Sequence, residues 1–261
     1  MIAALRAELV KLRRRRVLIV TAATTIVFTV GSAAIVLASA ERSGNPRDRG
    51  VTFASLADAG GGTEVFTTAV SFAGTFLFVV FVGAVAVEFS RGTFRTMLLH
   101  QPRRLRLLAG KMAALLAFAA AVLAAAETLT WVAAKLLGPW QEVATGGWIS
   151  FAALGDALAD YGSVLFWVTG YALLGMTLAV LVRSVPVALA IGIAWAGPFE
   201  HLLQDAWNPA QRVFPGLLLE AFVAGGTSEV SASRALLTVT AYLMVAVTIA
   251  GITFARRDIT A

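Results

Sequence analysis

The segment RRRRVLIVTAATTIVFTVGSAAIVLA, residues 13–38, decides the fold class of this chain. Four arginines precede the stretch Val17–Ala38, which carries no charged residue. The hydrocarbon core of a bilayer is about 30 Å thick, and roughly 20 apolar residues cross it as a helix, because a helix satisfies its own backbone hydrogen bonds. The segment therefore predicts a membrane-spanning helix with a basic group at its start.

Five further stretches meet or approach the same length and apolarity. They are Val65–Val87, Met112–Ala134, Tyr161–Val182, Val185–Leu203 and Ala235–Ala255. Apolar residues make up 59% of the 261 residues and charged residues 14%, which leaves too little polar surface to cover a soluble domain of this size. We expect one all-α integral membrane domain over residues 1–261, with six transmembrane helices.

A secretory signal peptide is the alternative for the first span. The chain begins with a basic region, and Ala38-Ser39-Ala40 imitates a cleavage site. However, the apolar part of a signal peptide is usually 7–15 residues long, which is shorter than Val17–Ala38. We expect the span to be retained.

The placement of Lys and Arg predicts the orientation in the membrane. Alternate connections hold fifteen of the 21 Lys and Arg residues, and eleven of the fifteen Asp and Glu residues lie in the Arg-poor connections. By the positive-inside rule, both termini and the 88–111 loop are cytoplasmic. The net charge of +6 then reflects topology and contact with lipid headgroups, and we expect no nucleic-acid partner.

Residues 1–16 have the pattern of an amphipathic helix. Apolar side chains recur on one face: Ile2, Leu5, Leu9 and Leu12. Charged side chains occupy the other side: Arg6, Glu8, Lys11 and Arg13. We expect a helix in the plane of the membrane interface that supports the bundle, the alternative being that the arginines only fix orientation.

The connection after the second span has more pattern than a simple link needs. Gly92 permits a sharp turn out of the membrane, and Thr93 can cap a short helix. Three apolar residues then share one exposed helical face: Phe94, Met97 and Leu98. Such a face either docks in the groove of a partner or folds back onto the bilayer, and the residues alone favour neither.

Proline divides this loop into two helices. Pro102 ends the short helix and can stand in the first turn of the next one, which runs through Arg103 and Arg104 into the third span.

These features resemble the membrane subunits of type II ABC exporters, the ABC-2 type permeases. That family has an interfacial helix before span one with a run like Glu8-Leu9-Val10-Lys11-Leu12-Arg13. It also has a loop after span two that this chain matches with Glu88, Gly92, Thr93, Leu98, Pro102, Arg103, Arg104 and Lys111. The resemblance implies that the helix near 93–100, with Phe94 and Met97, is a cytoplasmic coupling helix that docks on an ATP-binding subunit.

The chain contains no phosphate-binding loop of the form G-x4-G-K-[ST], because Gly60-Gly61-Gly62 is followed by Thr63-Glu64. We therefore expect a transport subunit that is not an enzyme and holds no cofactor, with ATP and Mg²⁺ in a separate ABC ATP-binding subunit. The resemblance further implies a second permease chain, identical or different, in a bacterial plasma membrane. The apolar and aromatic walls of the spans favour an amphiphilic substrate, such as a drug, an antibiotic peptide or a lipid.

Two polar features lie within or beside the spans. Glu127 is the one acid inside an apolar run, about 24 Å from its cytoplasmic end and near Trp131. It serves either structural pairing at the outer interface or the handling of substrate or protons.

The fifth span breaks at Gly197-Pro198. The resemblance implies a re-entrant hairpin on the outer face, with a candidate gate at Pro198, Glu200 and His201 and a second limb at 217–222. This region contains no second His for a metal site and no nucleophile beside His201 for a hydrolytic site, so we expect no metal.

Two other functions stay open from the residues. A membrane-embedded enzyme could act on lipid through Glu127 or the Glu200–His201 region. A membrane anchor or sensor that transports nothing is the second.

Overall fold

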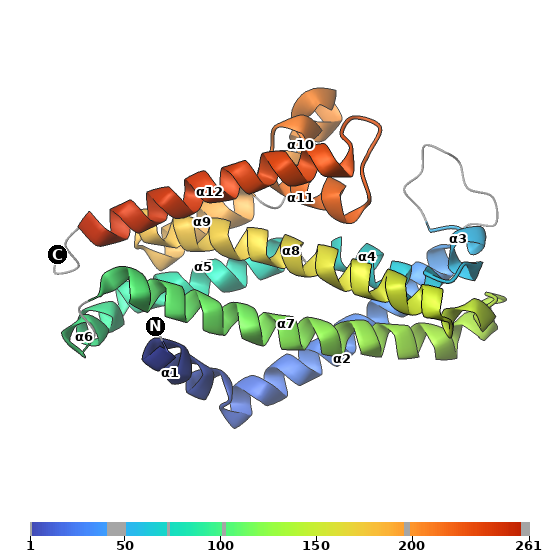
Figure 1. Ribbon diagram of the computed structural model, residues 1–261, viewed down its shortest axis with the longest axis horizontal. Helices are drawn as coiled ribbons and strands as arrows, with labels where there is room; N and C mark the ends of the chain where they lie inside the picture. Colours follow the sequence, from blue (N-terminus) through green and yellow to red (C-terminus); the bar gives the residue numbers. More distant parts are fainter. Residues whose placement is uncertain (1, 41–50, 72–73, 101–102, 196–198, 257–261) are drawn as a thin grey trace. The chain divides into compact units, whose positions relative to one another are not determined.

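The computed structural model describes all residues except 1, 41–50, 72–73, 101–102, 196–198 and 257–261. The described residues form helices and no strand, which confirms the all-α prediction (Figure 1). They divide into two compact units, one of residues 1–10, 73–117 and 166–261, the other of residues 11–72 and 118–165.

Four helices are long and apolar enough to cross a bilayer. They are α2 (Arg15–Ser39), α7 (Arg104–Leu137), α8 (Phe151–Val182) and α12 (Ala232–Arg256). With 25 residues, α2 is about 37 Å long, which exceeds the thickness of the hydrocarbon core. These helices match four of the six predicted spans.

Shorter helices occupy the other two predicted spans. The second predicted span overlaps α4 (Gly61–Ser71) and α5 (Gly74–Ser90), and the fifth contains α9 (Val185–Ala194) and the start of α10 (Glu200–Ala206). The break predicted at Gly197-Pro198 falls outside the described residues. The total of six spans stays a prediction.

The helix α8 begins at Phe151, ten residues before the span predicted from Tyr161, and the bounds of that span within the helix stay a prediction. The Ser150 hydroxyl accepts a hydrogen bond from the Ala153 N–H at 3.1 Å, as an N-cap residue does. The first turns contain Asp156 and Asp160, whose charges ended the apolar pattern although the backbone is helical.

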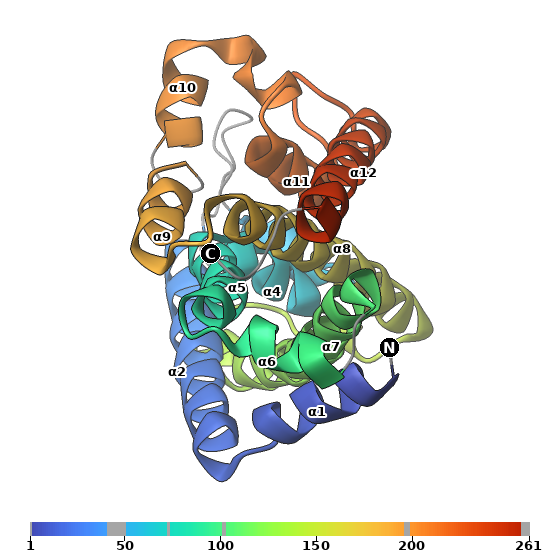
Figure 2. The same cartoon turned by 90° about the vertical axis from the view of Figure 1, so that its left-hand side faces the viewer.

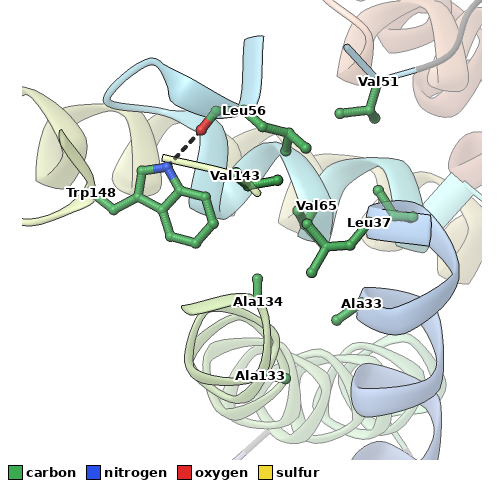
Figure 3. Packing of buried hydrophobic residues seen from close by; sticks show 10 residues of the cluster. Ala33, Leu37, Val51, Leu56, Val65, Ala133, Ala134, Val143 and Trp148 are labelled. Carbon is green, nitrogen blue, oxygen red and sulfur yellow. Dashed lines mark hydrogen bonds between the residues drawn. The ribbon is translucent and has the colours of Figure 1, made fainter. Parts of the chain in front are cut away.

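The unit of residues 11–72 and 118–165 also contains α3 (Phe53–Ala57) and two 3₁₀ turns, η1 (Gly138–Gln141) and η2 (Gly146–Trp148). Figure 3 shows its hydrophobic core. The buried members are Ala33, Val36, Leu37, Val51, Leu56, Val65, Ala133, Ala134, Val143 and Trp148. The Trp148 indole N–H donates to the Leu56 carbonyl at 2.8 Å, so the largest side chain of this core is fixed by a hydrogen bond.

The other unit is built on two helix pairs, α5 with α9 and α11 (Pro215–Val223) with α12 (Figure 2). Gly192 allows the first pair to approach, because a Cβ there would meet the Phe78 ring at 2.7 Å. This unit also contains α6 (Thr93–His100) and η4 (Asn208–Arg212).

The predicted N-terminal helix is present as α1 (Ile2–Leu12), and one of its side chains differs from the prediction. Ile2 is 67% exposed, as an apolar side chain directed at lipid would be, whereas Glu8, predicted on the charged side, is 6% exposed. The basic run is split, since Arg14 caps α2 and the last two arginines of the run begin that helix.

Candidate functional site

The helix predicted in the 88–111 loop is α6. Gly92 precedes it with a φ of 66°, a left-handed conformation that favours glycine. Its carbonyl accepts hydrogen bonds from the N–H groups of Arg95 at 3.1 Å and Thr96 at 3.4 Å. Gly92 therefore has the cap position that we predicted for Thr93, and Thr93 is the first helical residue.

Phe94 anchors α6 in a cluster of three aromatic rings. It is fully buried, and its ring centroid lies 4.6 Å from that of Phe89 in α5 and 5.2 Å from that of Phe254 in α12. Each such pair stabilises by about 0.5–1.5 kcal/mol beyond the area it buries. The prediction that Phe94 is exposed is wrong, because pairing with these rings removes it from the helix surface.

Other residues form the outward face of α6. Arg95, Thr96 and Leu99 are exposed, Leu99 to 80%. Met97 and Leu98 are half-buried. The exposed face of α6 is therefore partly apolar and partly charged, because it carries both Leu99 and Arg95.

A buried ion cluster joins α1, the end of α5 and the start of α7. The Lys111 ammonium contacts Glu8 Oε1 and lies 3.1 Å from Glu88 Oε1. The side chains of Lys111, Glu8 and Glu88 are only 6%, 7% and 12% exposed. Removing a charge from water costs several kcal/mol, so each of these groups depends on the opposite charge beside it.

The start of α7 is tied to the end of α12. Arg104 Nη1 donates to the Ala255 carbonyl at 3.2 Å. Arg103 is exposed, and its carbonyl accepts a hydrogen bond from the N–H of Leu107 at 3.2 Å. Pro102, predicted between α6 and α7, lies outside the described residues.

The predicted outer gate is described in part. Pro198 lies outside the described residues. Glu200 is buried, and its Oε2 accepts a hydrogen bond at 3.0 Å from the N–H of Leu217, in the first turn of α11 where such N–H groups lack helical partners. His201 Nε2 lies 3.3 Å from Glu220 Oε2. Two links therefore join α10 to α11, and the re-entrant path of these helices stays a prediction.

A cavity of about 900 Å³ lies within the unit of residues 11–72 and 118–165. Glu127 and Trp131 line it from α7, Trp148 from the segment before α8, and Tyr161 from α8. Glu127 Oε1 is buried and has no hydrogen-bond partner among the described residues. The predicted polar residue and its neighbouring tryptophan thus line one cavity.

Comparison with known proteins identifies the family. A family model described as ABC-2 family transporter protein matches residues 4–203. The chain belongs to this family. No curated protein matches the chain. The match to the ABC-2 family runs from α1 into α10, and it includes α6, the ion cluster and the cavity.

Membership of the ABC-2 family makes this chain a multi-pass membrane component of a transporter, which is not itself catalytic. The family implies an ABC ATP-binding partner in general. Across the residues that the structure describes, no group of three or more His, Asp and Glu side chains has a geometry suited to a metal ion.

Sequence reasoning missed two features of this ABC-2 transporter chain. It did not pair Lys111 with Glu8, although a lysine directly before an apolar run calls for a nearby acid. It also did not predict that Trp148 and Tyr161 line the same cavity as Glu127. The segment before α8 contains no apolar run, so hydropathy gave no indication of where it packs.

Proposed function

We propose that this chain is the permease subunit of an ATP-driven exporter and works with a separate ABC ATP-binding subunit. The observation that supports this most is the arrangement of α6: a short helix with one side held in an aromatic cluster and the other exposed. A helix held in this way can receive a partner on its outer face and transmit force through its inner one.

The contacts of α6 suggest how force would pass to the long helices. Phe94 packs on rings from both α5 and α12, so displacement of α6 acts on two helices at once. The ion cluster at Lys111 links the end of α5 to α7 and α1. In this proposal, closure of the ATP-binding subunit pushes α6, and these links convert the push into movement of the helices.

The remaining parts of the proposal follow from sequence and family. Two permease chains, identical or different, enclose the transport path in a bacterial plasma membrane, and the basic connections place both termini and α6 in the cytoplasm. The cargo is an amphiphile, because the apolar helices suit an apolar body. Lipid surrounds the assembly and serves as its solvent.

The exposed end of α6 gives the sharpest test. We expect Leu99→Asp to abolish recovery of a stoichiometric ATP-binding subunit when the tagged chain is purified from its native membrane in mild detergent. ATPase activity in the eluate, assayed with and without added lipid, should fall with it. The chain itself should remain in the membrane, since Leu99 is 80% exposed and contributes little to packing.

Leu136→Asp is the matched control. Leu136 and Leu99 are each the last residue but one of a helix, and Leu136 is 68% exposed. Because Leu136 belongs to the other compact unit and is no part of α6, this variant should keep the partner. Equal recovery in both variants, or no ATP-binding subunit with the unaltered chain, would contradict the proposal and favour a sensor or an enzyme acting alone.

A further inference from the structure

The cavity beside Glu127 combines a broad apolar wall with one carboxylate. Its volume of about 900 Å³ lies in the range of 300–1,000 Å³ that is usual for small-molecule sites. Phe151, Leu154 and Leu158 line it and are 96%, 57% and 66% exposed. In a bilayer such side chains meet acyl chains, so an amphiphile can enter the cavity sideways from the membrane.

Glu127 is half-buried, and its buried Oε1 atom differs in its surroundings from the carboxylates of the buried acids Glu8 and Glu200. Lys111 neutralises Glu8, and a backbone N–H donates to Glu200. Glu127 Oε1, in contrast, has no hydrogen-bond partner within the described part of the chain, and the nearby carboxylate of Asp160 repels it. A buried carboxylate in this position is stabilised by a cation.

Most of the ionisable groups around the cavity are acids. Four further acids interact with one another or with Glu127 at this end of the unit: Asp58, Glu64, Asp156 and Asp160. Lys135 stands two helical turns beyond Glu127 on α7, and its ammonium donates to the Thr145 carbonyl at 2.7 Å. A positive group in the cavity would favour the ionised form of these acids, whereas an anion would be repelled by them.

Aromatic rings of the kind that attract a cation lie around the cavity, and hydrogen bonds hold two of them in place. The Trp148 indole donates to a backbone carbonyl at 2.8 Å, and the Tyr161 hydroxyl donates to the Ala120 carbonyl at 3.0 Å. The Lys135 ammonium lies 5.9 Å from the ring centroids of both Trp131 and Trp148, so these rings accept a cation from the protein itself.

Glycine makes room for this aromatic wall. A Cβ on Gly62 would lie 2.6 Å from Trp131 Cδ1 and 3.1 Å from Trp148 Cδ2. The glycine run that could not bind phosphate therefore has a packing role, which is to let both indoles lie against α4.

We propose that this cavity binds a monovalent organic cation with an apolar tail. The positive group is held by Glu127 and by the Trp131 ring one helical turn away, and the tail lies on Leu154 and Leu158. This inference rests on the proposed transport function, for which it names the class of cargo, but the binding itself requires no ATP-binding partner.

The test is equilibrium binding to the full chain in nanodiscs of phosphatidylcholine, with empty nanodiscs as the blank. The probes are radiolabelled decyltrimethylammonium and decanesulfonate, which share a ten-carbon tail and differ in the sign of their charge. We expect saturable binding of the cation and none of the anion. Equal binding of both probes would overturn the proposal and make the cavity a site for neutral acyl chains.

Variants separate the charge from the fold. Glu127→Gln should weaken binding of the cation about tenfold or more, because it removes the charged partner of the positive group. Trp131→Leu should weaken it about threefold. Glu127→Lys should reverse the preference and bind decanesulfonate, a gain that a misfolded chain cannot give. An unchanged Kd in Glu127→Gln would contradict the proposal.

Glu142→Gln is the control, because it removes the same charge from an exposed residue of the same unit that does not line the cavity. Its Kd should equal that of the unaltered chain. If the cation is a lipid, adding lysyl-phosphatidylglycerol to the nanodiscs should displace the probe; if it is a small amphiphile, the probe should stay bound.

A second copy of the chain is the competing occupant. The chain has no cysteine, so Leu158→Cys introduces a single thiol. Oxidative cross-linking to a dimer that removes probe binding would show that this face is an interface between copies. Because the assay contains no ATP-binding subunit, its failure leaves the α6 proposal standing, and loss of the partner in Leu99→Asp leaves cation binding unchanged.

Discussion

At the scale of single residues, Lys111 has the largest energetic consequence. One ammonium contacts two carboxylates from different helices, and all three side chains are nearly buried. We expect Lys111→Met to destabilise the chain by about 3–5 kcal/mol, because it removes the ammonium that lies between the buried carboxylates of Glu8 and Glu88. The midpoint of thermal unfolding in detergent, followed by tryptophan fluorescence, measures the effect.

The triple variant Lys111→Met, Glu8→Met, Glu88→Met is the matched control for this prediction. It removes the three charges together, and replacement of a whole buried ion cluster by apolar residues of similar volume is often close to neutral in stability. It should recover most of the lost midpoint. If the single variant unfolds at the same temperature as the unaltered chain, the cluster contributes nothing to stability.

At the scale of elements, α6 depends on its aromatic anchor more than on its own eight residues. A helix this short is unstable alone, so packing must hold it in place. Phe94→Ala removes a fully buried ring and should cost about 3–5 kcal/mol, with fraying of α6 and loss of the ATP-binding partner. Hydrogen exchange of the amides in residues 93–100 measures the fraying.

Phe94→Leu is the comparison that separates volume from ring pairing. It keeps a large apolar group in the site and should retain α6 and the partner, with a smaller loss from the ring pairs. Rapid exchange in both variants would show that ring pairing itself holds the helix. Slow exchange in Phe94→Ala would show that α6 needs no anchor.

The sequence predicts elements here better than it predicts what their side chains contact. A run of apolar residues sets where α2, α7 and α12 lie, and the glycine before α6 sets where that helix begins. It does not show that Phe94 turns inward, because the partner ring of Phe254 lies far away in the chain. The burial of Glu8 is missed for the same reason, because its cation, Lys111, lies on α7 and far away in the chain.

At the scale of the whole molecule, the number of membrane crossings determines on which side of the membrane each connection lies. Four long helices are present, while the spans predicted at 65–87 and 185–203 each fall on two shorter helices, α4 followed by α5 and α9 followed by α10. A six-span chain and a four-span chain place the connections on different sides. The basic loops favour six spans, because with six spans the 88–111 loop lies in the cytoplasm.

A chain without cysteine lets single thiols report the side of each connection. We expect an impermeant maleimide to label Ser150→Cys and Ser228→Cys in intact cells, and to label Thr96→Cys and Ser184→Cys only after permeabilisation. In a four-span chain with a cytoplasmic N-terminus, Thr96→Cys and Ser184→Cys would be labelled directly and Ser150→Cys protected. An inverted six-span chain would share that pattern except at Ser228→Cys, which would be protected. The four labels therefore decide together whether α4 with α5, and α9 to α11, cross the membrane, and whether α6 faces the compartment that holds ATP.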